Sequence, residues 1–129
     1  MSTRVWRLLW LDGGAGLSVG VAVLAVRGWL AGLYGWSVAA VTAVGVANVA
    51  YATGSLTLAL VARRRPPRRR WIDLLIGANL AWTVVCATLI ATTAGPARGW
   101  GVAHLAAEGA FVAGLALVER RYLRPRAAP

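Results

Sequence analysis

The sequence contains no lysine and only four acidic residues, so its formal charge of +10 comes from 14 arginines. Its one cysteine, Cys86, excludes an intramolecular disulfide. Its one histidine, His104, has no cysteine near it in the sequence, and a structural zinc site needs about four such ligands. A glycine-rich loop of nucleotide-binding spacing is also missing. We therefore expect neither a metal nor a cofactor.

Charged residues are scarce as well. They make up 14% of the 129 residues, hydrophobic residues make up 59%, and the mean hydropathy is +0.64. Soluble domains are about 25% charged and about 45–50% apolar, so this composition indicates a membrane protein. It excludes a soluble enzyme, a disordered chain and a disulfide-rich secreted module. The length suits one domain.

Four apolar runs are long enough to cross the hydrocarbon core, which takes about 20 helical residues. They cover residues 8–26, 38–62, 71–92 and 100–118. None alternates in polarity as a barrel strand does, and lipid requires the backbone to be paired within each segment. Pro66–Pro67 and Gly95–Pro96 interrupt the runs. The sequence predicts an all-α fold, a four-helix bundle in a single transmembrane domain spanning residues 1–129.

Arginine placement predicts the orientation of the bundle. Twelve arginines fall on one side, in the N-terminal segment, the loop 63–70 and the tail 119–129, and only Arg27 and Arg98 fall on the other. Positive residues stay in the cytoplasm, so both termini, the loop and the tail are predicted to be cytoplasmic in a bacterial inner membrane. Six of the seven tryptophans fall near span ends, as interfacial anchors do, and Trp82 falls at the centre of the third span.

A cleaved signal peptide is the alternative interpretation of the first run. Arg4 and Arg7 precede the apolar residues, and small residues surround Ala25. Asp12, however, interrupts the run, and the run is longer than the apolar region of most signal peptides. Cleavage would leave three spans, and we favour four.

The basic loop RRRPPRRR suggests an anionic partner. Clusters of four to eight arginines beside a span attract anionic lipid headgroups. Aromatic residues that could stack on bases are absent between these arginines, so we expect no nucleic acid. The diproline could also stiffen a docking segment for a protein partner. The predicted lipid contacts are Arg63, Arg64, Arg65, Arg68, Arg69 and Arg70.

The four acidic residues differ in depth. Asp73 lies in the first turn of the third span, where Arg69 can pair with it, and Glu119 lies beside two arginines at the predicted interface. Both are interpreted as structural. Asp12 lies inside the first span on one stripe with Gly16 and Gly20, a spacing that allows close helix contact. Asp12 is therefore predicted to face protein.

Glu108 lies near the middle of the fourth span, one turn after His104. A charge at that depth costs about 2.5–3.5 kcal/mol, so Glu108 should be protonated or hydrogen-bonded. Polar and small residues form a stripe on each of the second and third spans, and all these faces can converge. The result is either a structural hydrogen-bond network or a pocket for a ligand or proton. The candidate residues are Glu108, His104, Asn79, Trp82, Asp12 and Asn48.

The length, the early acid and the stretch Gly77-Ala78-Asn79-Leu80-Ala81-Trp82 resemble small four-span bacterial inner-membrane proteins described as DoxX-like. This resemblance covers the whole chain loosely and implies no substrate. The use of arginine for every basic residue is similar to that in proteins encoded by GC-rich genomes. Small multidrug-resistance exporters have a similar size and a carboxylate in their first span. Those with dual topology need nearly equal numbers of positive residues on the two sides of the membrane, whereas this chain has twelve arginines on one side and two on the other.

These observations favour a non-enzymatic membrane component, either an accessory subunit or a pocket protein with a polar site around Glu108. The alternative is a proton-coupled small-molecule transporter that acts as an oligomer. A membrane enzyme ranks third because the sequence offers neither a recognisable nucleophile–base pair nor a metal set. Expected partners are the lipid bilayer, a second copy of the chain or another membrane protein.

Overall fold

The computed structural model describes residues 3–93 and 99–129, with side chains from residue 6 onward. It is an all-α bundle without strands in the described residues. Four helices are long and apolar enough to span a membrane, which confirms the predicted fold class. In chain order the helices are α1 (Thr3–Ala25), α2 (Arg27–Tyr34), α3 (Val38–Ala62), α4 (Arg69–Thr93) and α5 (Gly99–Tyr122), followed by the 3₁₀ turn η1 (Arg124–Arg126).

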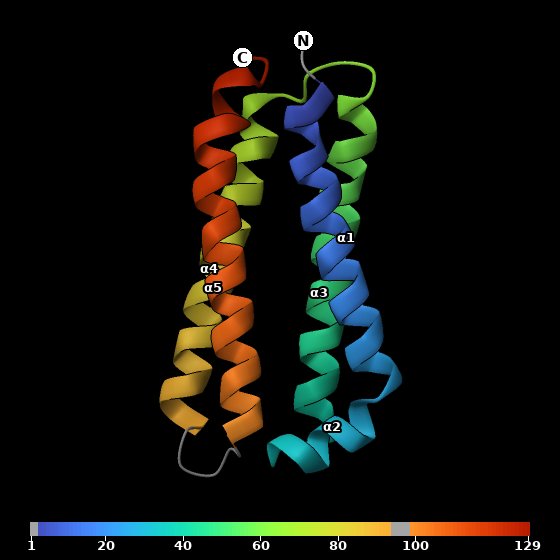
Figure 1. Ribbon diagram of the computed structural model, residues 1–129, viewed down its shortest axis with the longest axis vertical. Helices are drawn as coiled ribbons and strands as arrows, with labels where there is room; N and C mark the ends of the chain where they lie inside the picture. Colours follow the sequence, from blue (N-terminus) through green and yellow to red (C-terminus); the bar gives the residue numbers. More distant parts are fainter. Residues whose placement is uncertain (1–2, 94–98) are drawn as a thin grey trace.

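The predicted spans agree with these helices to within a few residues, and the second span has the bounds of α3. The segment 27–37 connects the first two spans, and the sequence did not predict that it contains a helix. The short helix α2 lies across the end of the bundle away from the termini (Figure 1). Leu30, Ala31 and Tyr34 form its buried face, and Gly35 ends it with a φ of 72°. The predicted break at Gly95–Pro96, and Arg98, lie outside the described residues.

The bundle consists of two helix pairs, α1 with α3 and α4 with α5 (Figure 1). Contacts within each pair are dense, and contacts between α3 and α4 or between α1 and α5 are sparse. Neighbouring helices in a pair run in opposite directions, and both termini lie at one end with the loop that joins α3 to α4. The contact surface between the pairs is therefore where grooves can form.

Small residues bring α1 and α3 together, as the stripe through Asp12 predicted. A Cβ atom on Gly20 would lie 2.9 Å from the carbonyl oxygen of Gly45 and 2.7 Å from a methyl group of Val49. The backbones approach so closely that only glycine fits at this point. Van der Waals packing of this kind drives helix association in lipid.

We expect Gly20→Ala to lower the free energy of unfolding by about 1–3 kcal/mol, the usual cost of overpacking. Gly14→Ala is the matched control on the same helix, because a Cβ atom there meets nothing within 4 Å. Thermal unfolding in detergent micelles measures both. Equal melting temperatures for the two variants would show that the close approach contributes nothing.

At the terminal end of the bundle the tail closes over the basic loop. The Ala128 N–H donates to the Pro67 carbonyl at 3.0 Å, and the Arg69 N–H donates to the Ala128 carbonyl at 2.6 Å. Arg124 pairs with Asp73 at 2.5 Å, whereas the sequence had suggested Arg69 as the partner of Asp73. These contacts hold the segment 66–69 against the C-terminal tail.

Candidate functional site

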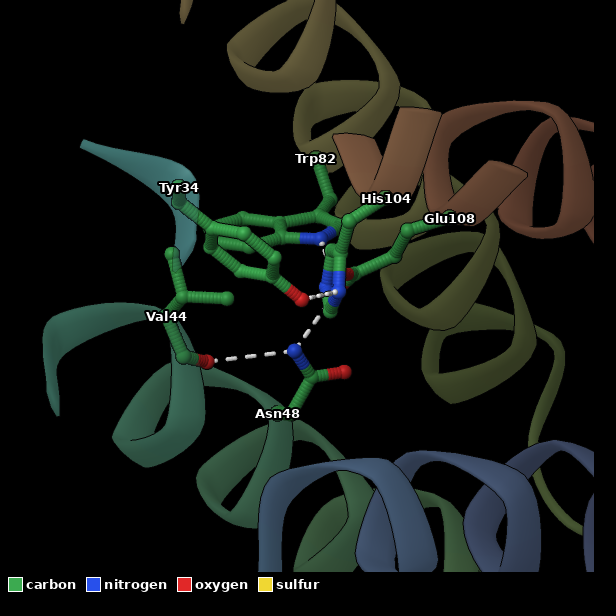
Figure 2. Close-up of polar contacts among 6 residues, drawn as sticks. All are labelled: Tyr34, Val44, Asn48, Trp82, His104 and Glu108. Atoms are coloured by element: carbon green, nitrogen blue, oxygen red, sulfur yellow. Dashed lines mark hydrogen bonds and ion pairs between the residues drawn. The ribbon is translucent and has the colours of Figure 1, made fainter. Parts of the chain in front are cut away.

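Glu108 of α5 is the centre of a hydrogen-bond network that joins both helix pairs (Figure 2). Its Oε1 accepts hydrogen bonds from Asn48 Nδ2 of α3 and from Trp82 Nε1 of α4, both at 2.7 Å. Its Oε2 lies 2.8 Å from His104 Nε2, one helical turn earlier on α5. Asn48 is oriented by a second bond, which it donates to the Val44 carbonyl at 3.1 Å. The carboxyl group therefore has partners on three spanning helices.

The network continues from His104 to α2. The Tyr34 hydroxyl lies 2.8 Å from His104 Nδ1, so the chain of polar atoms runs Tyr34, His104, Glu108. Burial and the nearby Glu108 raise the pKa of Tyr34 above its ordinary value, so its hydroxyl keeps its proton at neutral pH. Oε1 of Glu108 accepts hydrogen bonds from both Trp82 and Asn48, which only donate to it. A proton exchanged between Glu108 and His104 therefore lies on Oε2.

A second carboxyl group, Asp12 of α1, is bound to α3. Its Oδ2 accepts hydrogen bonds from the Tyr51 hydroxyl at 2.5 Å and from the Ser55 hydroxyl at 2.8 Å. Only 2% of Asp12 is exposed, as predicted for an acid that faces protein. Its Oδ1 accepts no hydrogen bond from the described residues, so one oxygen of this carboxyl group remains available.

A groove with a volume of about 300 Å³ connects these two carboxyl groups. Its polar lining consists of Asp12, Asn48, Tyr51, His104 and Glu108. Its apolar lining comes from α1 and α5, namely Ala15, Gly16, Val19, Ala107, Phe111 and Val112. The groove therefore lies between the helix pairs, and two carboxyl groups face an otherwise largely apolar surface.

A third buried acid lies apart from the groove. Glu119 of α5 is completely buried, and its Oε2 accepts a hydrogen bond from Asn79 Nδ2 of α4 at 3.1 Å. Its Oε1 is buried without a hydrogen-bond partner in the described residues. Glu119 was expected to lie beside the two arginines that follow it, but its side chain turns into the bundle while Arg120 and Arg121 are exposed.

The expected convergence of polar faces is found for some residues only. The structure brings together Glu108, His104, Asn48 and Trp82, and the groove adds Asp12. Asn79 does not join them, because it lies on α4 closer to the termini and binds Glu119. The predicted stripe of small and polar residues on α3 is buried throughout; it consists of Gly45, Asn48, Ala52, Ser55 and Ala59.

Sequence reasoning placed Ser55 on the buried stripe of α3 without its partner Asp12, and it missed Tyr34, Tyr51 and Glu119 as partners. A signal existed for two of these three. Tyr51 and Ser55 continue the stripe of Asn48 at helical spacing, and Glu119 follows Glu108 by 11 residues, which is three helical turns on the same face. Tyr34 comes from a segment predicted as a connection and carried no such signal.

Among the described residues, no group of three or more His, Cys, Asp or Glu side chains could hold a metal ion. Cys86 packs on Gly109 of α5 and does not line the groove. Comparison of the chain with protein-family models, with curated proteins and with solved structures finds no match.

Proposed function

We propose that this integral membrane protein binds a small lipophilic organic cation, such as an amine or quaternary ammonium compound, in the groove between its helix pairs. The observation that carries the proposal is the placement of Asp12 and Glu108 in one groove of about 300 Å³. Such a volume lies at the lower end of the range for small-molecule sites, which are mostly apolar with a few polar groups.

The charge of the groove supports a cationic ligand. Its lining includes two carboxyl groups, and His104 is its only basic residue. All the arginines with described side chains lie outside the lining. Tyr51 and Phe111 offer aromatic rings beside the carboxyl groups, and aromatic faces attract cations. The apolar lining by alanine, glycine and valine suits the hydrocarbon part of such a ligand.

A binding role agrees better with the site than a catalytic one, since its polar groups bind one another and Cys86 lies outside it. We propose a bacterial inner-membrane location with both termini cytoplasmic, on the strength of the arginine distribution. The DoxX-like resemblance and an association with a second copy or another membrane protein stay predictions.

Proton-coupled transport of the same cation is the second candidate, and one observation favours it. Tyr34, His104 and Glu108 form a continuous chain of exchangeable protons from α2, at one end of the bundle, to the groove. A cation that displaces a proton from Glu108 could release it along this chain. Binding alone requires no such chain.

The test is the binding of benzyltrimethylammonium to the purified protein in detergent, measured by isothermal titration calorimetry. We expect Glu108→Gln to weaken binding by about thirtyfold, because the loss of a desolvated charge partner costs about 2 kcal/mol or more. Asp73→Asn is the matched control, because Asp73 is an exposed carboxylate that pairs with Arg124 away from the groove.

The neutral isostere neopentylbenzene separates charge from shape. We expect it to bind more weakly than the cation and to be insensitive to Glu108→Gln. Equal affinities of the wild type and Glu108→Gln for benzyltrimethylammonium, with helical content preserved in circular dichroism, would exclude the groove as a cation site.

A further inference from the structure

A larger groove lies on another face of the bundle, between α3 and α4. Its volume is about 910 Å³, and only Tyr51 is shared with the lining of the groove at Glu108. One end lies beneath the basic loop, where Arg65, Arg68 and Arg70 line it. The rest is lined mainly by aliphatic and small side chains, including Leu58, Leu74 and Ala78.

We propose that this groove binds one anionic phospholipid, with its phosphate on the arginines at the mouth and an acyl chain between α3 and α4. The site is independent of the proposed cation site. The sequence predicted lipid contact for all six arginines of the loop, whereas this proposal assigns the headgroup to the arginines that line the groove.

The length of the groove agrees with one leaflet. The α3 residues that line it run from Ala50 to Val61, which at 1.5 Å per residue is about 16 Å. The hydrocarbon core is about 30 Å thick, so the groove extends from the interface to about the middle of the bilayer. An acyl chain of a single phospholipid occupies the same depth.

The tail holds the backbone of the loop at the mouth, and the arginines there lack acidic partners among the described residues. The hydrogen bonds of Ala128 to Pro67 and Arg69 fix the loop beside the tail, and Ala128 itself lines the groove. None of Arg65, Arg68 and Arg70 forms an ion pair with a described residue. The site therefore presents unneutralised positive charge at headgroup depth above an apolar slot, which is the complement of an anionic phospholipid.

Two arginines of the same loop serve as an internal control. Arg63 lies over the ring of Trp10 at 5.6 Å, on the side of α1, and Arg64 is exposed without lining the groove. Attraction of the whole loop to a negative surface would depend on all these arginines equally. A built site depends on Arg65 and Arg68 and not on Arg63 and Arg64.

The groove itself can be filled without disturbing the protein. Gly54 lines it, and a Cβ atom there meets nothing within 4 Å, so Gly54→Leu places a side chain in the acyl slot. Gly114 on α5 is equally open and does not line this groove, so Gly114→Leu is the matched control.

Native mass spectrometry of the detergent-purified protein, titrated with dioleoylphosphatidylglycerol, tests the proposal. We expect one tightly retained lipid in the wild type and much weaker retention of dioleoylphosphatidylcholine, which has the same acyl chains. Arg65→Gln/Arg68→Gln should weaken phosphatidylglycerol binding by about tenfold or more, since each arginine near an anionic headgroup contributes about fivefold. Gly54→Leu should also abolish the retained lipid, and Gly114→Leu should not.

Three results would overturn the proposal. One is equal loss of binding in Arg63→Gln/Arg64→Gln and Arg65→Gln/Arg68→Gln, which would indicate attraction of the loop as a whole. Another is unchanged lipid retention in Gly54→Leu. The third is displacement of the lipid by inorganic phosphate at millimolar concentration, which would indicate a phosphate site that does not use the acyl slot.

Discussion

Replacing Asn79 by leucine is expected to destabilise the bundle by about 3 kcal/mol. Asn79 provides the hydrogen bond to Glu119, whose other carboxyl oxygen is already buried without a partner in the described residues. Interhelical hydrogen bonds in membranes contribute only about 0.6 kcal/mol on average. The larger effect expected here comes from the carboxyl group that would be left buried and unpaired, because an unsatisfied buried group costs about 1–3 kcal/mol and a charged one costs more.

The double variant Asn79→Leu/Glu119→Leu distinguishes these two contributions. Replacing both partners by apolar groups of similar size is often close to neutral. We therefore expect the double variant to recover most of the stability that Asn79→Leu loses. Steric trapping in bicelles measures the free energy of unfolding of the wild type, the single variant and the double variant. A double variant as unstable as the single one would show that Asn79 acts through packing and not through Glu119.

Cation binding in the groove is expected to weaken strongly as the pH falls, by up to about tenfold per pH unit on the acidic side of the transition. The sign follows from the chemistry of the site. Protonation of a carboxyl group removes the negative charge that attracts the ligand, so proton and cation compete. The groups that face Glu108 are Asn48 of α3, Trp82 of α4 and His104 of α5, and a protonated His104 would repel the cation as well.

Calorimetric titration with benzyltrimethylammonium between pH 3.5 and pH 8, in buffers of different ionisation enthalpy, measures both the affinity and the number of protons released. At a pH where the carboxyl group is protonated before the cation binds, we expect about one proton released per cation in the wild type. In Glu108→Gln the affinity should depend less on pH. Any pH dependence that remains would come from Asp12, the other carboxyl group of the groove. Equal affinity of the wild type at both ends of this range would contradict competition at Glu108.

The Tyr34→Phe variant distinguishes binding of the cation from its proton-coupled transport. Phenylalanine keeps the ring on α2 and removes the hydroxyl that contacts His104 Nδ1. Equilibrium affinity should change little, because Tyr34 does not line the groove. In liposomes with an imposed pH gradient, a transporter that uses the chain of Tyr34, His104 and Glu108 should be slowed by this substitution. A protein that only binds the cation should show no flux to slow.

Much of the architecture could be predicted because lipid imposes strict rules on a chain. The bounds of α3 were predicted to the residue, since a long apolar run in a bilayer has to be helical. Helical periodicity also identified the buried face of α3 and the pairing of His104 with Glu108, which lie one turn apart on the same helix. Both depend on local geometry alone.

The contacts that the sequence did not predict are made by long side chains and join segments that are distant in the sequence. Glu119 stands next to two arginines in the sequence, yet its side chain turns away from them and reaches Asn79, 40 positions earlier. Asn79 lies three positions before Trp82 on α4, about 4.5 Å nearer the terminal end of the bundle. The two side chains therefore contact different neighbours on α5. Sequence spacing gives the face of a helix and does not give the partner that the face meets.

The sequence by itself determined that the chain is helical, that four of its helices can span a membrane, and that Asp12 and Glu108 lie where lipid would not tolerate them alone. Hydrophobic length and the cost of unpaired polar groups in hydrocarbon account for these results. Only the tertiary structure decided that α1 pairs with α3 and α4 with α5, and that Asp12 and Glu108 line one groove while Glu119 binds Asn79 outside it. The reason is that pairing depends on close packing between helices, such as that of Gly20 against Gly45, and not on mean hydropathy, which is similar in all four spans.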